Sequence, residues 1–335
     1  MLNLGDKGIG IIGLGSCAPE KVLTNFDLEK MVETSDEWIT KRTGISERRI
    51  LDEDKPAYEM GVEAAKKAIE DAGITAEDID LIICTTSTPD YLSPSTASII
   101  QKYIGASKAA AFDLNAACSG FVYGITTASN FIATGYSKYV LVVGCEALSK
   151  VVDWQDRNTC VLFGDGAGAC VLGPVEKEHG IISTYLGADG SLGHNITIPC
   201  CYIDQSDIEK RRRGEKLVVW MDGSEVFKFA VRIMAQAIEK VLADSNVSIE
   251  DVKLIIPHQA NVRIIDGAVK KLGISADKVY VNVQKYGNTS SASIPVALDE
   301  AIKEKAINKG DYIVLVGFGG GLTWASTLIK WNKEV

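Results

Sequence analysis

Histidine is scarce in this sequence, and paired-cysteine motifs and long apolar runs are missing from it. His179, His194 and His258 are the three histidines among 335 residues, so few side chains can act as a general base near neutral pH. None of the eight cysteines belongs to a C-x-x-C pair. This pattern argues against a zinc site or a disulfide framework and favours a reduced, cytoplasmic protein.

Positive charge and membrane signals are also lacking. The formal net charge is −9, which argues against general nucleic-acid binding. The longest apolar runs have the length of a strand, too short for a transmembrane helix. The first residues contain no basic stretch followed by a long apolar core, so we expect no signal peptide. The composition therefore predicts a globular protein with a large core and no membrane association.

The sequence repeats itself at one offset. Residues 77–83 (EDIDLII) reappear as residues 250–256 (EDVKLII), and 250 − 77 is 173. Residues 139–144 (YVLVVG) reappear as 312–317 (YIVLVG), and 312 − 139 is again 173. Two matches at one offset indicate two similar halves.

Each half alternates apolar strands with helices. A helix is expected over 57–72 before the first copy of the repeat and over 226–243 before the second, and the continuous apolar strands are typical of a sheet covered on both faces. We therefore predict two mixed α/β halves, 1–175 and 176–335, packed around a pseudo-two-fold axis. The alternative is two α/β domains that are alike only in alternating strands with helices and are not related as repeats.

Cys118 lies where an apolar strand changes into a helix. The segment from Phe112 to Leu114 is followed by small residues, and from Phe121 apolar side chains recur with a helical period. A thiol at a helix N-terminus faces free N–H groups and the positive end of the helix dipole. Such a position can lower a cysteine pKa from ~8.5 to roughly 3.5–7.5. The alternative is that Cys118 is an ordinary buried small residue.

The repeat relates Cys118 to two other polar positions. Adding 173 to Thr85 gives His258, which follows the strand 254–256, and adding 173 to Cys118 gives Ser291, close to Asn288. Ligands of α/β sheets gather at the carboxyl ends of strands, so we expect Cys118, His258 and Asn288 to converge. A structural histidine and a helix-capping asparagine are the alternatives.

Glycine-rich and basic segments complete the pattern. Three consecutive glycines, 319–321, leave N–H groups free to form an oxyanion hole, unless they form only a flexible turn. Trp38 and Arg42 stand one helical turn apart and could hold a planar, phosphate-bearing ligand, unless they are simply solvated. The segment 8–13 matches G-x-G-x-x-G, but no strand precedes it, so it is expected to be a glycine-rich first strand.

Taken together, these segments resemble β-ketoacyl-acyl carrier protein synthase III, the condensing enzyme that starts type II fatty acid synthesis. The resemblance covers nearly the whole chain. It implies the thiolase-like five-layer αβαβα fold, an α/β fold of two similar halves, and a homodimer whose sheets continue across the interface. The matching segments are Thr34–Ile39, Arg42–Ile45, Ala116–Phe121, Phe163–Ala169, Pro257–Asn261, Tyr286–Ser290 and Phe318–Trp324.

The resemblance also implies roles for individual residues. Cys118 resembles the acyl-accepting nucleophile, and His258 and Asn288 resemble the pair that bonds the malonyl thioester carbonyl. The N–H groups of Cys118 and Gly320 resemble the oxyanion hole. Further residues resemble the contacts of the family with its two substrates: Trp38 and Arg157 around the coenzyme A adenine, Arg42 and Asn261 on the rest of coenzyme A, and Lys228, Arg263, Lys270 and Lys271 on the acidic acyl carrier protein.

The implied reaction takes an acyl group from acyl-CoA onto Cys118 and condenses it with malonyl-acyl carrier protein, with loss of CO2, giving 3-oxoacyl-acyl carrier protein. Loss of CO2 from the malonyl group supplies the carbanion, so the reaction needs no strong base. The resemblance implies no metal and no permanently bound cofactor. Alternatives are a related Cys-His-Asn condensing enzyme of secondary metabolism, a cysteine thioester hydrolase and a non-catalytic carrier-binding protein. Small Ser93 predicts acceptance of primers larger than acetyl, and the stretch 203–217 is longer than usual for the family.

Overall fold

Two β-sheets form the framework of the molecule. The computed structural model describes residues 3–4, 6–200, 217–304 and 307–334, and the long stretch 203–217 noted above lies outside them except for its last residue. A six-stranded sheet has the order β1-β2-β8-β7-β5-β6, and a four-stranded sheet has the order β12-β13-β14-β9. Their strands are β1 Asn3–Leu4, β2 Lys7–Cys17, β5 Leu81–Thr85, β6 Ala110–Leu114, β7 Val140–Ala147, β8 Asp165–Glu176, β9 Gly180–Ala188, β12 Val252–Pro257, β13 Tyr312–Gly319 and β14 Thr323–Lys330.

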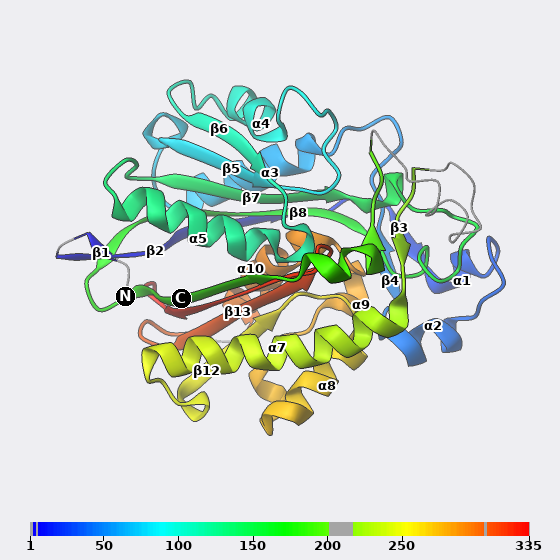
Figure 1. Ribbon diagram of the computed structural model, residues 1–335. Coiled ribbons are helices and arrows are strands. Elements are labelled where there is room, and N and C mark those ends of the chain that lie inside the picture. The colour runs from blue at the N-terminus through cyan, green and yellow to red at the C-terminus, as the bar shows by residue number, and fades with distance from the viewer. Residues whose placement is uncertain (1–2, 5, 201–216, 305–306, 335) are drawn as a thin grey trace.

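Helices cover both faces of each sheet. In Figure 1, α5 (Gly120–Ala133) and α10 (Ser293–Glu304) lie between the two sheets. The outer layers are α3 (Tyr58–Asp71) with α4 (Thr96–Ile104) on the six-stranded sheet, and α7 (Gly223–Ser245) with α8 (Val262–Leu272) on the four-stranded sheet. This arrangement confirms the predicted five-layer αβαβα fold and its long helices near 57–72 and 226–243.

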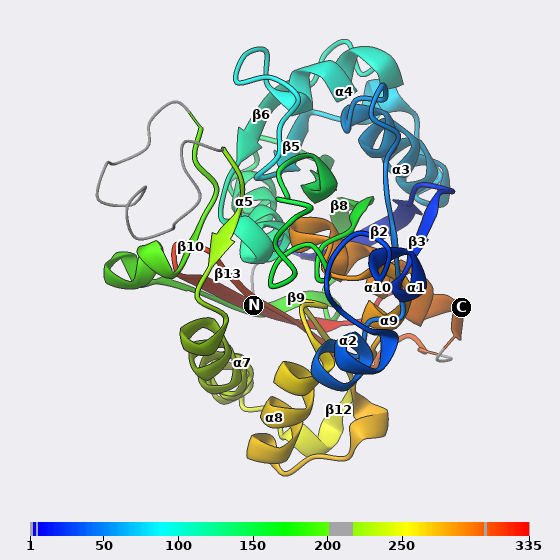
Figure 2. The same ribbon diagram turned by 90° about the vertical axis from the view of Figure 1, so that its right-hand side faces the viewer.

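Smaller elements gather at the carboxyl ends of the strands, on the side that faces the viewer in Figure 2. They form a small hydrophobic cluster of their own, which includes Leu28, Ile39 and Val161. The elements are β3 Val22–Thr24, α1 Asn25–Leu28, α2 Asp36–Thr43, β4 Glu47–Arg49, β10 Ile196–Thr197, β11 Trp220–Met221 and α9 Val283–Tyr286.

The central core confirms the helical face predicted after Cys118. Phe121, Ile125, Ala128 and Ile132 of α5 are all fully buried between the sheets. Burial of a large apolar side chain contributes about 1.5–3 kcal/mol. The apolar face therefore fixes α5 between the sheets and, with it, the turn that precedes the helix.

The two halves repeat in structural detail. Parallel pairing of β5 with β7 sets Leu81 opposite Val140, and that of β12 with β13 sets Leu254 opposite Ile313, which are the same positions moved by 173 residues. The six-stranded sheet ends at Glu176 and the four-stranded sheet begins at Gly180. The pseudo-two-fold repeat is thereby confirmed, while the division of the chain at 175/176 stays a prediction.

The glycine motifs serve close packing. Residues 8–13 lie in β2, as expected, and a Cβ atom added to Gly13 would lie 2.1 Å from the carbonyl oxygen of Ala68 in α3. A Cβ atom on Gly168 of β8 would lie 2.7 Å from Pro295 of α10. Only glycine allows helices to approach the sheet this closely.

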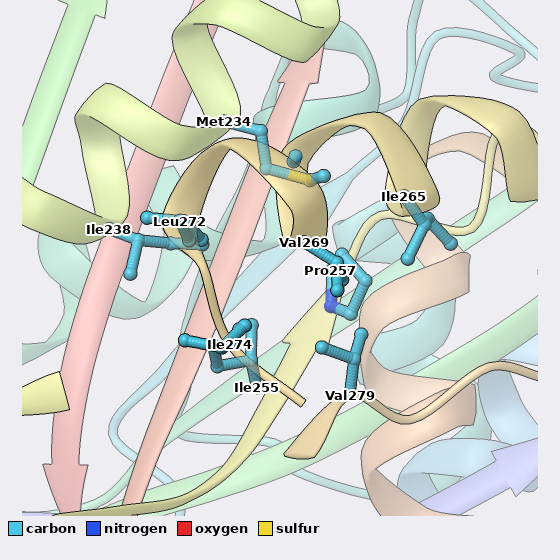
Figure 3. A pocket seen from close by; sticks show the side chains of 10 residues that line it. Met234, Ile238, Ile255, Pro257, Ile265, Val269, Leu272, Ile274 and Val279 are labelled. Carbon is cyan, nitrogen blue, oxygen red and sulfur yellow. The ribbon is translucent and has the colours of Figure 1, made fainter. Parts of the chain in front are cut away.

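A small void lies between α7, α8 and β12 (Figure 3). Its volume is about 10 Å³, and apolar side chains such as Met234, Pro257 and Ile265 line it. An apolar void of this size stays dry. It is a packing defect behind the strand that leads to His258, and it offers no room for a substrate. Separately, none of the helices within the described ranges has the length and apolar character needed to cross a membrane.

Candidate active site

The nucleophile turn connects β6 to α5. Asn115 Oδ1 accepts a hydrogen bond of 3.1 Å from Ala117 N, and Ala117 adopts φ of +47°, a left-handed conformation that costs a non-glycine residue roughly 1–3 kcal/mol. The 3₁₀ helix η2 (Ala117–Ser119) follows and leads directly into α5. The structure thus confirms the change from strand to helix at Cys118.

The second half contains the same turn, moved by 173 residues. Asn288 Oδ1 accepts a hydrogen bond of 2.8 Å from Ser290 N, and Ser290 also has φ of +47°. The 3₁₀ helix η7 (Ser290–Ala292) then leads into α10. Asn288 is therefore the repeat mate of Asn115, and Ser291 is the mate of Cys118. The two turns are in contact at the centre of the molecule.

The Cys118 thiol does not have the low pKa that its helix position predicts. The residue keeps part of its surface exposed, but its sulfur lies deep enough that burial raises the pKa to about 12. A hydrogen bond from the Ser290 side chain opposes this rise, and the charge of Glu146 adds to it. Desolvation can shift a pKa by several units, more than a helix end supplies. The expectation of a lowered pKa is wrong, because sequence reveals the helix end but not the burial.

His258 leaves the carboxyl end of β12 and is fully buried. Its backbone N–H donates to Val316 O over 2.8 Å, and its ring packs edge-on against Phe318 with a centroid distance of 5.3 Å. Nδ1 lies 2.7 Å from Ser293 Oγ. Burial lowers the pKa of His258 to about 3, so the ring is neutral near pH 7. When Ser293 donates to Nδ1, the single ring proton stays on Nε2 and is available to a ligand.

Asn288 is held by both its backbone and its side chain. Its N–H donates to Leu162 O over 2.8 Å, and its carbonyl accepts from Gly164 N over 3.0 Å. Because Oδ1 accepts from Ser290, the side chain presents its Nδ2 hydrogens as donors. Asn288 is not the cap of the following helix, since the N-cap of η7 is Thr289, and its bond to Ser290 N is a turn contact that orients the amide.

The three polar residues meet around the end of β13. A Cβ atom added to Gly319 of β13 would lie 2.6 Å from Cys118 N, so the nucleophile turn lies directly on this strand. His258 contacts Val316 and Phe318 of the same strand. Asn288 joins them because Ser290, whose N–H bonds the Asn288 side chain, belongs to the turn that contacts the nucleophile turn. The structure therefore brings Cys118, His258 and Asn288 to one site.

The glycine segment after β13 is tied to the nucleophile turn. Thr323 Oγ1 lies 2.9 Å from Ala116 O and 3.0 Å from Gly320 O, and it accepts a hydrogen bond of 2.8 Å from Ser119 Oγ. One hydroxyl thus fixes both segments whose N–H groups the resemblance assigns to an oxyanion hole. Thr323, Ser290 and Ser293 were not among the predicted site residues. The repeat was a signal for the two serines, since they are the mates of Ala117 and Gly120.

A separate open cleft of about 670 Å³ lies beside α2. The Arg42 guanidinium stands 4.3 Å and that of Arg157 5.3 Å from the centroid of the Trp38 ring. Asn261 Nδ2 donates to Arg42 O over 3.1 Å, while its Oδ1 caps α8. The four residues assigned to coenzyme A are therefore together. A flat base inserted between Trp38 and Arg157 needs about 7 Å, so Arg157 must move outward. The cleft is lined by Ser35, Glu37, Trp38, Lys41, Arg42 and Arg263.

A basic face extends from this cleft along α7 and α8. Lys228, Arg263, Lys270 and Lys271 are all exposed on these two helices, which pack against each other. Lys228 pairs with Glu225 over 2.8 Å, an exposed contact of little energetic weight. On α7 the basic and acidic residues balance, three of each, whereas α8 carries three basic residues against one acidic residue, so the excess of positive charge lies on α8. Among the described residues, no group of three or more His, Cys, Asp and Glu side chains is arranged to hold a metal ion.

The internally repeated αβαβα fold, with a cysteine on the strand-to-helix turn at its centre, defines a thiolase-type condensing enzyme. The chain belongs to the β-ketoacyl-acyl carrier protein synthase III family. Family models described as 3-oxoacyl-[acyl-carrier-protein] synthase III match residues 112–190, and the C-terminal model of that family matches 242–331. The protein is therefore an acyltransferase, as the sequence predicts.

Individual relatives agree with this assignment over full length. A β-ketoacyl-[acyl-carrier-protein] synthase III of Caldanaerobacter subterraneus is 53% identical over 97% of this chain and 98% of its own. The crystal structure of 3-oxoacyl-[acyl-carrier-protein] synthase III from Aquifex aeolicus superposes with a TM-score of 0.90 at 49% identity, covering 97% of this chain and 100% of the other. The priming β-ketosynthase of the R1128 polyketide pathway has a TM-score of 0.90 at 33% identity and covers 98% of both chains.

Proposed function

We propose that this enzyme starts fatty acid synthesis by transferring the acyl group of an acyl-CoA to Cys118 and condensing it with malonyl-acyl carrier protein. The observation that carries the proposal is the meeting of a cysteine that keeps part of its surface exposed, a neutral buried histidine and an oriented asparagine around the end of β13. The product is 3-oxoacyl-acyl carrier protein, and CO2 is released. The acyl-CoA is consumed as a substrate, so no permanently bound cofactor is needed.

In the first step, Cys118 Sγ attacks the thioester carbonyl of acyl-CoA. The new C–S bond forms as the bond to coenzyme A breaks, and the thiol proton passes to the departing sulfur, which gives a covalent acyl-enzyme. The N–H groups of Cys118 and Gly320 would stabilise the negative oxygen of the tetrahedral intermediate. Thr323 Oγ1 lies within hydrogen-bond distance of both Ala116 O and Gly320 O, which supports this arrangement, and its single proton is shared between the two oxygens.

In the second step, the malonyl group loses CO2, and the electron pair of the broken bond becomes an enolate. Nε2–H of His258 and Nδ2–H of Asn288 are the donors available to the enolate oxygen. A neutral histidine is suited to this task because it donates a hydrogen bond without giving up its proton. The enolate carbon then attacks the acyl group on Cys118, and the sulfur leaves as a thiolate as the new C–C bond forms. A proton taken up from solvent then restores the Cys118 thiol.

Two surfaces would receive the substrates. The cleft at Trp38, Arg42 and Arg157 offers an aromatic face and cations, which suit the adenine and phosphates of coenzyme A. The basic face on α7 and α8 offers the charge that an acidic carrier protein needs for steered association. The basic face adjoins the cleft, since Arg263 belongs to both surfaces.

A homodimer is proposed from the edge of the larger sheet. β6 is an end strand of this sheet, and its residues are at least partly exposed. A large apolar side chain near it is exposed as well: Tyr136, at 72%, packs on Phe131, which packs on Phe112 of β6. A second copy would pair β6 with β6, continue the sheet and cover this side chain. Sedimentation equilibrium tests this proposal: a particle of the 36.0 kDa of one chain would refute it.

A product assay tests the proposed reaction. With acyl-CoA and malonyl-acyl carrier protein we expect 3-oxoacyl-acyl carrier protein and one CO2 per condensation. Free fatty acid without a condensed product would instead indicate a thioester hydrolase, and a strong preference for a carrier of polyketide synthesis would place the enzyme in secondary metabolism. Acetyl-, butyryl- and isobutyryl-CoA serve as primers. If the unchanged enzyme and Ser93→Phe exclude the larger primers equally, the prediction from Ser93 is wrong.

The same assay separates the two binding surfaces. Arg157→Ala removes a cation from Trp38 and should raise KM for acyl-CoA about tenfold, with KM for the malonyl carrier unchanged. Lys270→Glu should do the reverse and lose its effect at high salt. Lys66→Glu, an equally exposed charge reversal on α3, is the control and should change neither. Equal effects of Arg157→Ala on both KM values would contradict the assignment of the cleft.

A further inference from the structure

Glu146 is a buried carboxylate that the reaction described above does not use. It lies near the end of β7 and has no exposed surface. Placing a carboxylate in such a position costs several kcal/mol unless hydrogen bonds compensate. The compensating donors are Ser87 N at 3.1 Å and Thr88 Oγ1 at 2.7 Å, with Thr86 Oγ1 more distant at 3.4 Å. All three belong to the segment that follows β5.

The other side of Glu146 faces the turn that carries Asn288. Ser291 Oγ lies 2.8 Å from Glu146 Oε1 and also 2.8 Å from Thr85 O. The Ser290 hydroxyl lies beside both Glu146 and the Cys118 thiol and lowers the pKa of each, and its single proton can be donated to only one of them at a time. Ser290 N in turn holds the Asn288 side chain. The carboxylate therefore anchors Ser291, the repeat mate of the nucleophile, next to Ser290, whose N–H orients the Asn288 side chain.

We propose that Glu146 is a positioning residue of the condensation, which fixes the turn from Asn288 to Ser291 against Cys118 and sets a negative charge behind the thiol. This inference rests on the proposed function, because it acts through Cys118 and Asn288. Burial raises the pKa of Glu146 above its ordinary value, and the hydrogen bonds from Thr88, Ser87 and Ser291 offset only part of that rise. The surrounding N–H and hydroxyl groups donate to the carboxylate form.

The charge of Glu146 has a measurable consequence at Cys118. It is one of the causes that raise the pKa of this thiol, and it acts in the same direction on Cys84 and Cys145, whose side chains lie in the core between the sheet and α3. The groups hydrogen-bonded to the carboxylate are the hydroxyl and N–H groups named above. Cys118 is therefore held as a thiol in the free enzyme and gives up its proton only during acyl transfer. This is the opposite of a resting thiolate.

Glu146→Gln tests the proposal because it removes the charge and keeps the shape. In the unchanged enzyme, alkylation of Cys118 by iodoacetamide should rise about tenfold per pH unit between pH 7 and 9, since the thiolate is the reactive form. In Glu146→Gln we expect alkylation about tenfold faster at pH 7 and a pH profile moved to lower pH. The condensation kcat should fall about tenfold, with KM for acyl-CoA unchanged. Peptide mass spectrometry distinguishes Cys118 from the other thiols.

Two further variants keep the test decisive. Asp165→Asn removes a comparably buried carboxylate of β8, whose donors are Ser149 and Leu51, and should leave the alkylation profile of Cys118 in place. Ser291→Ala keeps the charge of Glu146 but breaks its link to the turn, so it should lower kcat without moving the profile. If Glu146→Gln fails to fold, Ser291→Ala still tests the positioning role, and an unchanged kcat there refutes it.

The outcomes separate this inference from the proposed function. If Glu146→Gln folds and its alkylation profile is unmoved or shifts to higher pH, the inference about Glu146 is wrong. The proposed function would still stand if the unchanged enzyme forms an acyl adduct on Cys118 and condenses it with malonyl-acyl carrier protein. If that adduct never forms, the proposed function itself fails, and the role of Glu146 fails with it.

Discussion

Cys118→Ala is expected to form no acyl adduct with acyl-CoA and to lower the rate of condensation by more than about 10³-fold. The reason is chemical, because alanine has no atom that can form the thioester. The substitution shortens one partly exposed side chain and preserves the turn at Ala117, so the fold should persist. Loss of CO2 from malonyl-acyl carrier protein should continue, since this step uses His258 and Asn288. Intact-protein mass spectrometry detects the acyl adduct, and release of labelled CO2 measures the rate of decarboxylation.

Cys17→Ala is the matched control for this experiment. Cys17 is also a partly exposed free thiol, at the end of β2, and it should not take part in acylation. Its variant should acquire one acyl group, as the unchanged enzyme does. An adduct of normal stoichiometry on Cys118→Ala would show that another residue carries the acyl group. Loss of decarboxylation together with acylation would show that the two steps share more of the site than proposed.

The repeat made the fold predictable in unusual detail. An offset of 173 residues, read from two short segments, reproduces the register of β5 on β7 and of β12 on β13. It also reproduces the left-handed residue of each central turn. The local sequence predicts the strand register and the turn conformation because the two halves contain equivalent strands, an equivalent turn and an equivalent helix. The same offset relates Cys118 to Ser291, in the turn that begins at Asn288, from the sequence alone.

Groups that act through long-range contacts could not be predicted in this way. Thr323 bonds Ala116 O across 207 residues, and Ser291 bonds Glu146 across 145. Neither contact leaves a spacing pattern in the sequence. The pKa of Cys118 was predicted with the wrong sign for the same reason. The position of Cys118 at the N-terminus of α5, which favours a lower pKa, is visible in the local sequence. Burial of the thiol, which raises the pKa, depends on the packing of β13 and of the turn from Asn288 to Ser291 against Cys118.

His258→Ala and Asn288→Ala should show the reverse pattern of Cys118→Ala. Each removes one donor to the enolate oxygen, and loss of such a donor typically costs about 10²–10³ in rate. Decarboxylation and condensation should fall together by that factor, while the acyl adduct on Cys118 still forms at normal stoichiometry. The adduct also reports that the site is folded, which matters because the His258 ring is buried between Ser293 and Phe318.

The pH dependence of decarboxylation adds an independent check on His258. Burial lowers its pKa to about 3, so between pH 5 and 9 the ring stays neutral, and the donor is lost by protonation only at much lower pH. Decarboxylation by the unchanged enzyme should therefore show no step near pH 6.5, where an exposed histidine titrates. His194→Ala, which changes a histidine outside the site, should leave the rate unaltered. A step near pH 6.5 that disappears in His258→Ala would mean that the ring works as an acid or base, because a neutral hydrogen-bond donor cannot produce it.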